Sequence, residues 1–349
     1  MQSWFRPLAI AVAASLPLVA QANDRLSVYA WAEYLPDSVL TDFTKETGVR
    51  VDYATFDSNE ALYAKLKLLQ TSGASESYDL IFPSSYMLSK MAREGMLTPL
   101  DKSKLPHLEQ LEPSLLDREF DPGNRFSVPY AFGSTAIAVN RDELADAEIT
   151  SWQDLWSGQW QGQLMLTDDI RENFQMALLT LGHSANSREP AEIKAAYDKL
   201  VTLQDNVLLY NSDNPRMPYV AGEVSLGLIW SDQAYKTQQD GMPLEYVYPE
   251  EGAIFWVDSA AIPANAKSVD AAHQFIDFLM RPEIAARIIQ ELGIAVPNQG
   301  AKALLPAEVA DNQVLFPSGD IVAKGHFQDD LGDEVLAVYE EHWVRLRSN

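Results

Sequence analysis

Short apolar runs alternate with amphipathic stretches along the first third of the chain. The runs RLSVYAW, VRVDYATF and YDLIFPSS are rich in β-branched and aromatic residues, and DSVLTDFTKETG and NEALYAKLKLLQ separate them. This spacing predicts a βαβαβ order, in which Gly48 ends the first helix and Ser58 or Asn59 caps the second. We therefore expect a parallel sheet with helices on its faces.

A second alternation occupies the rest of the chain. It begins near GSTAIAVN, continues through GQLMLTDD, RENFQMALLTLG, NVLLY and EVSLGLIWSDQAY, and is followed by one more strand and two helices. Two α/β units without a flexible linker indicate a two-lobed α/β protein with a cleft between the lobes. Such sheets bind ligands beyond the carboxyl ends of their strands.

The composition is that of a folded, exported protein. A chain of 349 residues with 47% hydrophobic content can bury a large core and form two domains. Residues 1–22 carry one basic side chain, Arg6, an apolar run and a small-residue site, which together predict a signal peptide cleaved before Asn23. The chain has no cysteine, so neither a disulfide nor a lipid-modified cysteine can form, and we expect a periplasmic location.

The charge excludes nucleic acid as a partner. The chain has 26 Lys and Arg residues against 50 Asp and Glu residues, and its formal net charge is -24. A nucleic-acid-binding protein needs a basic surface to neutralise phosphates. The acidity keeps the protein soluble, and it also fits a preference for cationic ligands.

Polar and aromatic side chains gather where the predicted strands end. Asp169 and Glu172 lie three residues apart, so they can share one helix face, although an acidic first turn is also typical of an ordinary helix N-cap. The other residues that follow predicted strands are Trp31, Glu33, Tyr34, Ser84, Ser85, Tyr86 and Asp168. These positions are candidates for a ligand site.

Two Trp-Asp pairs have the same spacing of two residues, Trp230 with Asp232 and Trp256 with Asp258. On a strand, residues two apart point to the same side. Asp258 stands in the apolar run IFWVDSAAIP, where a carboxylate is costly unless a cation of the protein or of a ligand pairs with it. A core tryptophan followed by an aspartate that caps a turn is the alternative interpretation of each pair.

Aromatic walls with carboxylates between them suit a flexible alkyl chain that carries ammonium groups. Each methylene gains about 0.8 kcal/mol on burial, and each ammonium gains from carboxylates and aromatic faces. The segments FTKETGV, SNEALYAKLK, YDLIFPSSY, LTDDIRENFQMAL, NSDNP, IFWVDS, AIPANAK and FQDDLG go further. With them the chain resembles, over nearly its whole mature length, the periplasmic spermidine/putrescine-binding proteins of polyamine ABC importers.

The resemblance implies the site, the fold and the partners. Five aromatic residues would wall the polyamine: Trp31, Tyr34, Tyr86, Trp230 and Trp256. Five polar residues would hold its nitrogens: Ser84, Asp169, Glu172, Asp258 and Gln328. The fold would be the bilobed periplasmic binding protein fold of type II. Its N-terminal lobe would span 23–133 and 257–304, its C-terminal lobe 134–256 and 305–349, with crossings near Gly133, near Trp256 and after Gly293. The implied partner is an inner-membrane ABC permease, and the protein is expected to be a monomer.

Two positions depart from the spermidine-binding members of that family. Ala32 replaces a threonine, and Ile294 replaces a tyrosine in a GYPTPN-like run. A hydroxyl and an aromatic wall are therefore absent, which predicts a weaker preference for spermidine, while the carboxylates that recognise polyamines are present.

Other classes of protein fit the sequence less well. The hydrolase motifs G-x-S-x-G and S-x-x-K and the metalloprotease motif H-E-x-x-H are absent, so we expect no enzyme. Clustered acids disfavour an anion-binding protein, and the lack of cysteine and paired histidine disfavours a transition metal or a cofactor that depends on one. Calcium would not need tryptophan walls. A polyamine sensor that signals through a membrane receptor shares every site residue with a transport protein and remains the alternative.

Overall fold

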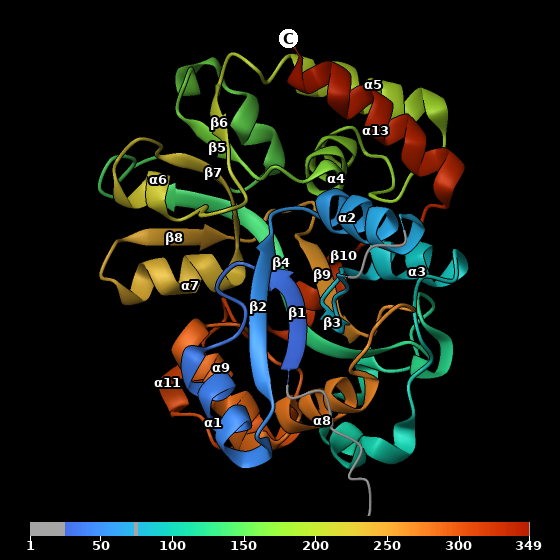
Figure 1. Ribbon diagram of the computed structural model, residues 1–349. Coiled ribbons are helices and arrows are strands. Elements are labelled where there is room, and N and C mark those ends of the chain that lie inside the picture. Colours follow the sequence, from blue (N-terminus) through green and yellow to red (C-terminus); the bar gives the residue numbers. More distant parts are fainter. Residues whose placement is uncertain (1–24, 73–75, 349) are drawn as a thin grey trace, which may run out of the picture.

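The computed structural model describes residues 25–72 and 76–348 (Figure 1). The predicted signal peptide, residues 1–22, lies outside them. Within the described ranges, no helix is long and apolar enough to cross a membrane.

The first α/β unit has the predicted order. Gly48 ends the first helix in the left-handed conformation, with φ of 76°. Ser58 caps the second helix, because its side chain accepts a hydrogen bond from the backbone N–H of Ala61. Both capping predictions are confirmed. The elements are β1 (Arg25–Trp31), α1 (Asp37–Thr47), β2 (Arg50–Phe56), α2 (Asn59–Thr71), β3 (Leu80–Ile81) and α3 (Ser85–Arg93).

The remaining strands add a second parallel group. They are β4 (Ser127–Asn140), β5 (Leu164–Leu166), β6 (Val207–Tyr210), β7 (Leu226–Trp230), β8 (Leu244–Val247), β9 (Ile254–Ala261) and β10 (His326–Phe327). The strand order is β2-β1-β3-β9-β4-β7-β5-β6, while β10 pairs with β9 and β8 with β4. β1 pairs in parallel with β2 and β3, and β5 with β6 and β7, whereas β4 and β9 are antiparallel. The antiparallel pair therefore joins two parallel groups.

In Figure 1, one group of helices lies at each end of the molecule and others lie between them. Further helices follow α3 in the chain. They are α4 (Ile170–Thr180), α5 (Pro190–Val201), α6 (Met217–Val220), α7 (Ser231–Gln239), α8 (Val269–Leu279), α9 (Pro282–Leu292), α10 (Gln299–Lys302), α11 (Ala307–Ala310), α12 (Gly319–Lys324) and α13 (Asp333–Arg347). Short 3-10 helices cover Lys102–Lys104, Pro106–Gln110, Pro113–Leu115, Pro122–Asn124, Trp152–Trp156 and Gly158–Trp160.

Each group of helices buries its own aromatic cluster. Phe43 of α1 packs edge to face against Phe275 of α8, with ring centres 4.7 Å apart. Phe174 of α4 packs in the same way against Tyr339 of α13 at 5.0 Å. The molecule therefore has two lobes. We call the one with α1 and α8 the N-terminal lobe and the one with α4 and α13 the C-terminal lobe.

The connections between the lobes run through the antiparallel strands. Gly133 of β4 lies opposite Trp256 of β9. Further along the chain, Val309 and Leu315 pack in the core of the N-terminal lobe, and Val314 contacts the cores of both lobes. The segment 309–315, at the end of α11 and just after it, therefore lies against both lobes. The residue boundaries of the lobes given above stay a prediction.

Candidate functional site

A pocket lies between the lobes, at the ends of strands from both. All the predicted ligand-binding residues except Tyr86 line it. The lining comprises Trp31, Ala32, Tyr34, Ser84, Asp169, Glu172, Trp230, Asp232, Gln233, Trp256, Asp258 and Gln328. Most of these residues lie at the end of a strand or at the start of a helix, as expected for α/β sheets. Trp256 and Asp258 lie within β9.

Tyr86 lies beside the pocket and does not line it. It belongs to the first turn of α3, so it faces another side than Ser84, which precedes that helix. The Tyr86 hydroxyl donates a hydrogen bond to Glu60 at 3.1 Å, and the guanidinium of Arg171 lies 5.2 Å from its ring centre. In the structure, Tyr86 therefore contacts protein groups outside the pocket lining.

The two departures from the spermidine-binding pattern have different positions. Ala32 lines the pocket. Ile294 is 1% exposed and packs in the core of the N-terminal lobe, outside the lining. Only Ala32 is therefore placed to contact a ligand directly.

Indole rings from both lobes meet across the pocket. Trp31 of β1 donates its indole N–H to the carbonyl of Phe82 at 3.1 Å. Its ring lies edge to face against the ring of Trp230, with centres 6.0 Å apart. The indole N–H of Trp256 is buried and has no acceptor among the described residues. The three rings thus form apolar walls, one of which keeps a free donor.

The position of Trp256 depends on Gly133. A Cβ atom at residue 133 would lie 2.4 Å from Cζ2 of Trp256 and 2.8 Å from Oγ of Ser231. Both distances are far below van der Waals contact, so only glycine leaves room for the indole at this point of β4. The strand that connects the lobes therefore also shapes the pocket wall.

Asp258 is held by hydroxyl groups of the N-terminal lobe. Tyr34 donates to its Oδ2 and Ser84 donates to its Oδ1, both at 2.6 Å. Asn59 fixes Ser84 in turn, because its side chain accepts from the Ser84 N–H and donates to Oγ, both at 3.0 Å. Asp258 itself is 5% exposed. The carboxylate thus has neutral donors on one side and the pocket on the other.

Glu172 is held in a similar way by the C-terminal lobe. Thr135 and Thr167 donate to its two oxygens, both at 2.6 Å, and the indole N–H of Trp230 donates to Oε1 at 3.0 Å. Asp169 caps α4 by accepting from the backbone N–H of Glu172 at 2.8 Å. The N-cap interpretation of this acidic turn is confirmed for Asp169, which also lines the pocket, so its role in ligand binding stays a prediction.

Asp232 is a further carboxylate of the pocket. Its spacing pairs it with Trp230 in the sequence, but it was not among the residues expected to hold the ligand. β7 ends at Trp230, and Asp232 lies in the first turn of α7, so strand alternation does not explain why both line the pocket. The Gln233 side chain donates to Oδ2 of Asp232 at 2.7 Å. The sequence signals for Asp232 were its place after a strand end and the Trp-Asp spacing that it shares with Asp258.

Four buried carboxylates therefore share one pocket without a cationic partner among the described residues. The exposed fractions are 9% for Asp169, 3% for Glu172, 8% for Asp232 and 5% for Asp258. In the part of the chain that the structure describes, none of them forms an ion pair with lysine or arginine. No group of three or more His, Cys, Asp or Glu residues within these ranges could hold a metal ion.

Burial makes these carboxyl groups weak acids. It raises the pKa of Asp258 to about 7, and the neighbouring charges of Asp232 and Asp169 add to the effect against the hydrogen bonds from Ser84 and Tyr34. Burial also raises the pKa of Asp232 to about 6. The pKa of Glu172 is raised by burial first and by Asp169 second. A ligand cation would stabilise the ionised forms.

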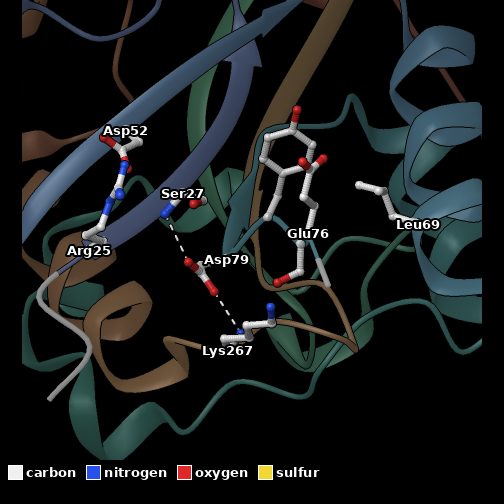
Figure 2. A pocket seen from close by; sticks show the side chains of 9 residues that line it. Arg25, Ser27, Asp52, Leu69, Glu76, Asp79 and Lys267 are labelled. Atoms are coloured by element: carbon white, nitrogen blue, oxygen red, sulfur yellow. Dashed lines mark hydrogen bonds and ion pairs between the residues drawn. The ribbon is translucent and has the colours of Figure 1, made fainter. Parts of the chain in front are cut away.

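A second hollow lies at the opposite end of β1 (Figure 2) and has a different character. Its acid Asp79 accepts hydrogen bonds from the backbone N–H groups of Ser27 at 2.9 Å, Lys267 at 2.7 Å and Ser268 at 2.8 Å. Asp52 pairs with Arg25. These carboxylates serve the packing of the N-terminal lobe, and the hollow lies away from the carboxyl ends of the strands.

The fold and the pocket are those of a solute-binding protein, and comparisons with known proteins agree. The family model described as bacterial extracellular solute-binding protein matches residues 38–317, and the chain belongs to this family. Its two-lobed fold is that of the type II periplasmic binding proteins.

Individual relatives indicate which members of the family the chain resembles. The chain is 47% identical to the spermidine/putrescine-binding periplasmic protein of Salmonella typhimurium, with 100% of this chain and 99% of that protein covered. It is 30% identical to the putrescine-binding periplasmic protein PotF of Escherichia coli, with 97% and 95% covered. A putative spermidine/putrescine ABC transporter structure from Listeria monocytogenes is 35% identical, with a TM-score of 0.88 and coverage of 93% and 99%. The predicted periplasmic location is confirmed by the relatives that are named periplasmic proteins.

Proposed function

We propose that the protein captures a polyamine of the putrescine/spermidine class in the periplasm and delivers it to an inner-membrane ABC permease. The observation that carries the proposal is a pocket of four buried carboxylates and three indole rings whose lining holds no lysine or arginine. The names of the relatives support the ligand class and the transport role. The protein acts as a monomer that binds its ligand without converting it.

Tight binding of a diamine requires both the aromatic walls and the carboxylates of the pocket. The four methylenes of a diamine contribute roughly 3 kcal/mol on burial, which alone corresponds to millimolar or weaker binding. Ammonium-carboxylate hydrogen bonds contribute more than neutral ones. Asp258 and Glu172 already have their neutral donors on the protein side, so their remaining capacity faces the ligand. Micromolar or tighter binding therefore needs the charged ends of the ligand.

Calorimetry of the mature protein, starting at Asn23, tests the proposal. Putrescine, cadaverine, spermidine, norspermidine and spermine are titrated at pH 8, with glutamate and calcium chloride as controls. At least one polyamine should saturate a single site with micromolar or tighter affinity. Binding of a control and of no polyamine would overturn the ligand class. Cross-linking of the protein to its membrane partner tests delivery. Capture of a permease supports transport, whereas capture of a receptor in place of a permease would make the protein a sensor.

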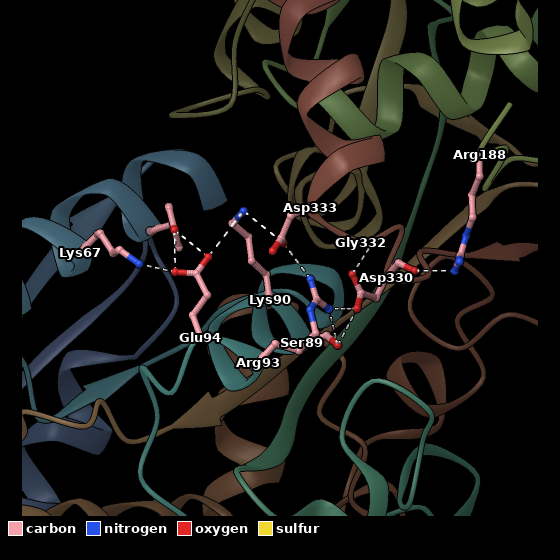
Figure 3. Close-up of polar contacts among 10 residues, drawn as sticks. Lys67, Ser89, Lys90, Arg93, Glu94, Arg188, Asp330, Gly332 and Asp333 are labelled. Carbon is pink, nitrogen blue, oxygen red and sulfur yellow. Dashed lines mark hydrogen bonds and ion pairs between the residues drawn. The ribbon is translucent and has the colours of Figure 1, made fainter. Parts of the chain in front are cut away.

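The lobes are in direct contact between α3 and the start of α13 (Figure 3). Arg93 of α3 pairs with Asp330 and, at 2.9 Å, with Asp333 at the start of α13. Lys90 also reaches Asp333, at 3.3 Å. Ser85, at the start of α3, donates to the carbonyl of Gln328 at 3.0 Å. One helix of the N-terminal lobe thus contacts the pocket at its beginning and the C-terminal lobe along its length.

Ligand binding is expected to make the protein more compact. The contacts just described, and the Trp31-Trp230 contact, can form only when the lobes meet, and a ligand held by carboxylates of both lobes favours that closed arrangement. Small-angle scattering of the mature protein should therefore give a smaller radius of gyration with saturating polyamine than without it. An unchanged radius, at a polyamine concentration where calorimetry shows saturation, would contradict lobe closure.

A further inference from the structure

A lysine of the protein lies at the edge of the pocket. Lys236 of α7 donates a hydrogen bond from Nζ to Oε2 of Glu33 at 2.7 Å, and 203 residues separate the two in sequence. Glu33 stands between two lining residues, Ala32 and Tyr34, and has a left-handed φ of 52°. Lys236 lies one helical turn after Asp232, which also lines the pocket. The ion pair therefore spans the rim between the two lobes.

The position of Lys236 is fixed by its surroundings. Its side chain is 18% exposed, whereas that of Glu33 is 47% exposed. Its Cγ lies 3.4 Å from the point where a side chain at Gly293 would begin, so the stem packs against the end of α9. Its positive charge also acts on the carboxylate of Asp232. An ammonium group of the protein itself is thus held beside the pocket carboxylates.

We propose that Lys236 is a built-in ammonium that limits the length of the ligand, so that the pocket prefers diamines to triamines. A diamine places both of its charges among Asp169, Glu172, Asp232 and Asp258. A third ammonium that extends toward α7 would meet the charge of Lys236, while the carboxylate that could receive it, Glu33, is already occupied. This inference rests on the proposed polyamine binding and concerns which polyamine the site selects.

The alternative role of this ion pair is only to stabilise the contact between the lobes. In that case its removal would weaken closure equally for every ligand. The ratio of the affinities for spermidine and putrescine distinguishes the two roles. An ion pair that only stabilises the lobe contact changes both affinities by the same factor and leaves their ratio unchanged.

Lys90→Met provides a matched control. Lys90 is 14% exposed on its side chain, similar to Lys236, and pairs with Asp333 across the lobes. Neither lysine lines the pocket, but Lys236 lies one helical turn from the lining residue Asp232, whereas no residue within one turn of Lys90 lines it. Both substitutions remove one cation from an interlobe ion pair and keep most of the aliphatic stem. They differ in whether the cation stands at the rim of the pocket.

Calorimetry of the mature protein with putrescine and spermidine decides the question. Lys236→Met should raise the affinity for spermidine relative to putrescine by at least about tenfold, and Lys90→Met should leave the ratio within about twofold of the parent. In the Glu33→Gln, Lys236→Met double variant the gain should be clearly smaller than in Lys236→Met, because the repulsion is removed but the carboxylate that would receive the third ammonium is lost as well. An unchanged ratio in Lys236→Met, or an equally large gain in the double variant, would overturn the inference. If the parent binds none of the five polyamines named above, the proposed function itself fails.

Discussion

Replacing Asp258 with asparagine is expected to weaken putrescine binding by about 2 to 4 kcal/mol, which is roughly 30- to 1000-fold. Asparagine keeps the shape of the side chain and removes its charge. Its amide can still accept from one hydroxyl and donate to the other, where Asp258 now accepts from Tyr34 and Ser84. The loss therefore comes from the charge-assisted hydrogen bond to the ligand. Calorimetry at pH 8 measures it.

The empty Asp258→Asn protein should be as stable as the parent or more stable. The buried carboxylate of the parent has no ion-pair partner in the described chain, and its raised pKa shows that its ionised form is disfavoured there. Asp79→Asn serves as the matched control. Asp79 is 4% exposed but accepts three backbone N–H groups away from the pocket, so its substitution should lower the melting temperature and leave affinity unchanged. Affinity of Asp258→Asn within about twofold of the parent would end the assignment.

Polyamine affinity is expected to fall by about 30-fold or more between pH 8 and pH 5.5. Putrescine is the ligand for this test, because its two primary ammonium groups titrate near pH 10, as lysine does, and their charge is constant over this range. Asp258, with a pKa of about 7, must lose its proton to pair with an ammonium, and so must Asp232, with a pKa of about 6. At pH 5.5 each binding event therefore carries the cost of deprotonation. Calorimetry across this range measures the profile, and Asp258→Asn should flatten it.

The stability of the empty protein should have the opposite trend. A carboxyl group whose pKa is higher in the folded than in the unfolded state stabilises the fold when protonated. That contribution is complete below about pH 4 and is lost as the pH rises through the folded value, which is about 7 for Asp258. The melting temperature of the parent should therefore fall, relative to that of Asp258→Asn, from pH 5.5 to pH 8. Parallel melting curves for the two proteins would contradict this reading of the site.

Local sequence patterns predicted much of the fold and of the site. The alternation of apolar runs with amphipathic stretches predicted β1 to β3 together with α1 and α2. Capping preferences predicted the roles of Gly48 and Ser58 at the helix ends. The rule that ligands bind beyond strand ends selected Trp31, Ser84 and Asp169, which the structure brings together. These signals succeed because each depends on a few neighbouring residues. Gln328 had no such signal and was expected only from the family resemblance.

Contacts between distant segments could not be predicted in this way. Tyr86 follows a strand end, but the first turn of α3 directs it to Glu60, and no periodicity specifies where that turn begins. The pair of Glu33 with Lys236 joins opposite lobes, so it depends on how the lobes meet. The fit of Trp256 against Gly133 depends likewise on the register of β4 and β9.

A crystal structure of the mature protein grown with putrescine would show directly which groups hold the ligand. We expect one ammonium nitrogen within about 3 Å of the Asp258 carboxylate and the other near Glu172, with the methylenes between the indole rings. Putrescine located outside this pocket, for example in the hollow beside Asp79, or held in the pocket without contact to any carboxylate, would contradict this expectation.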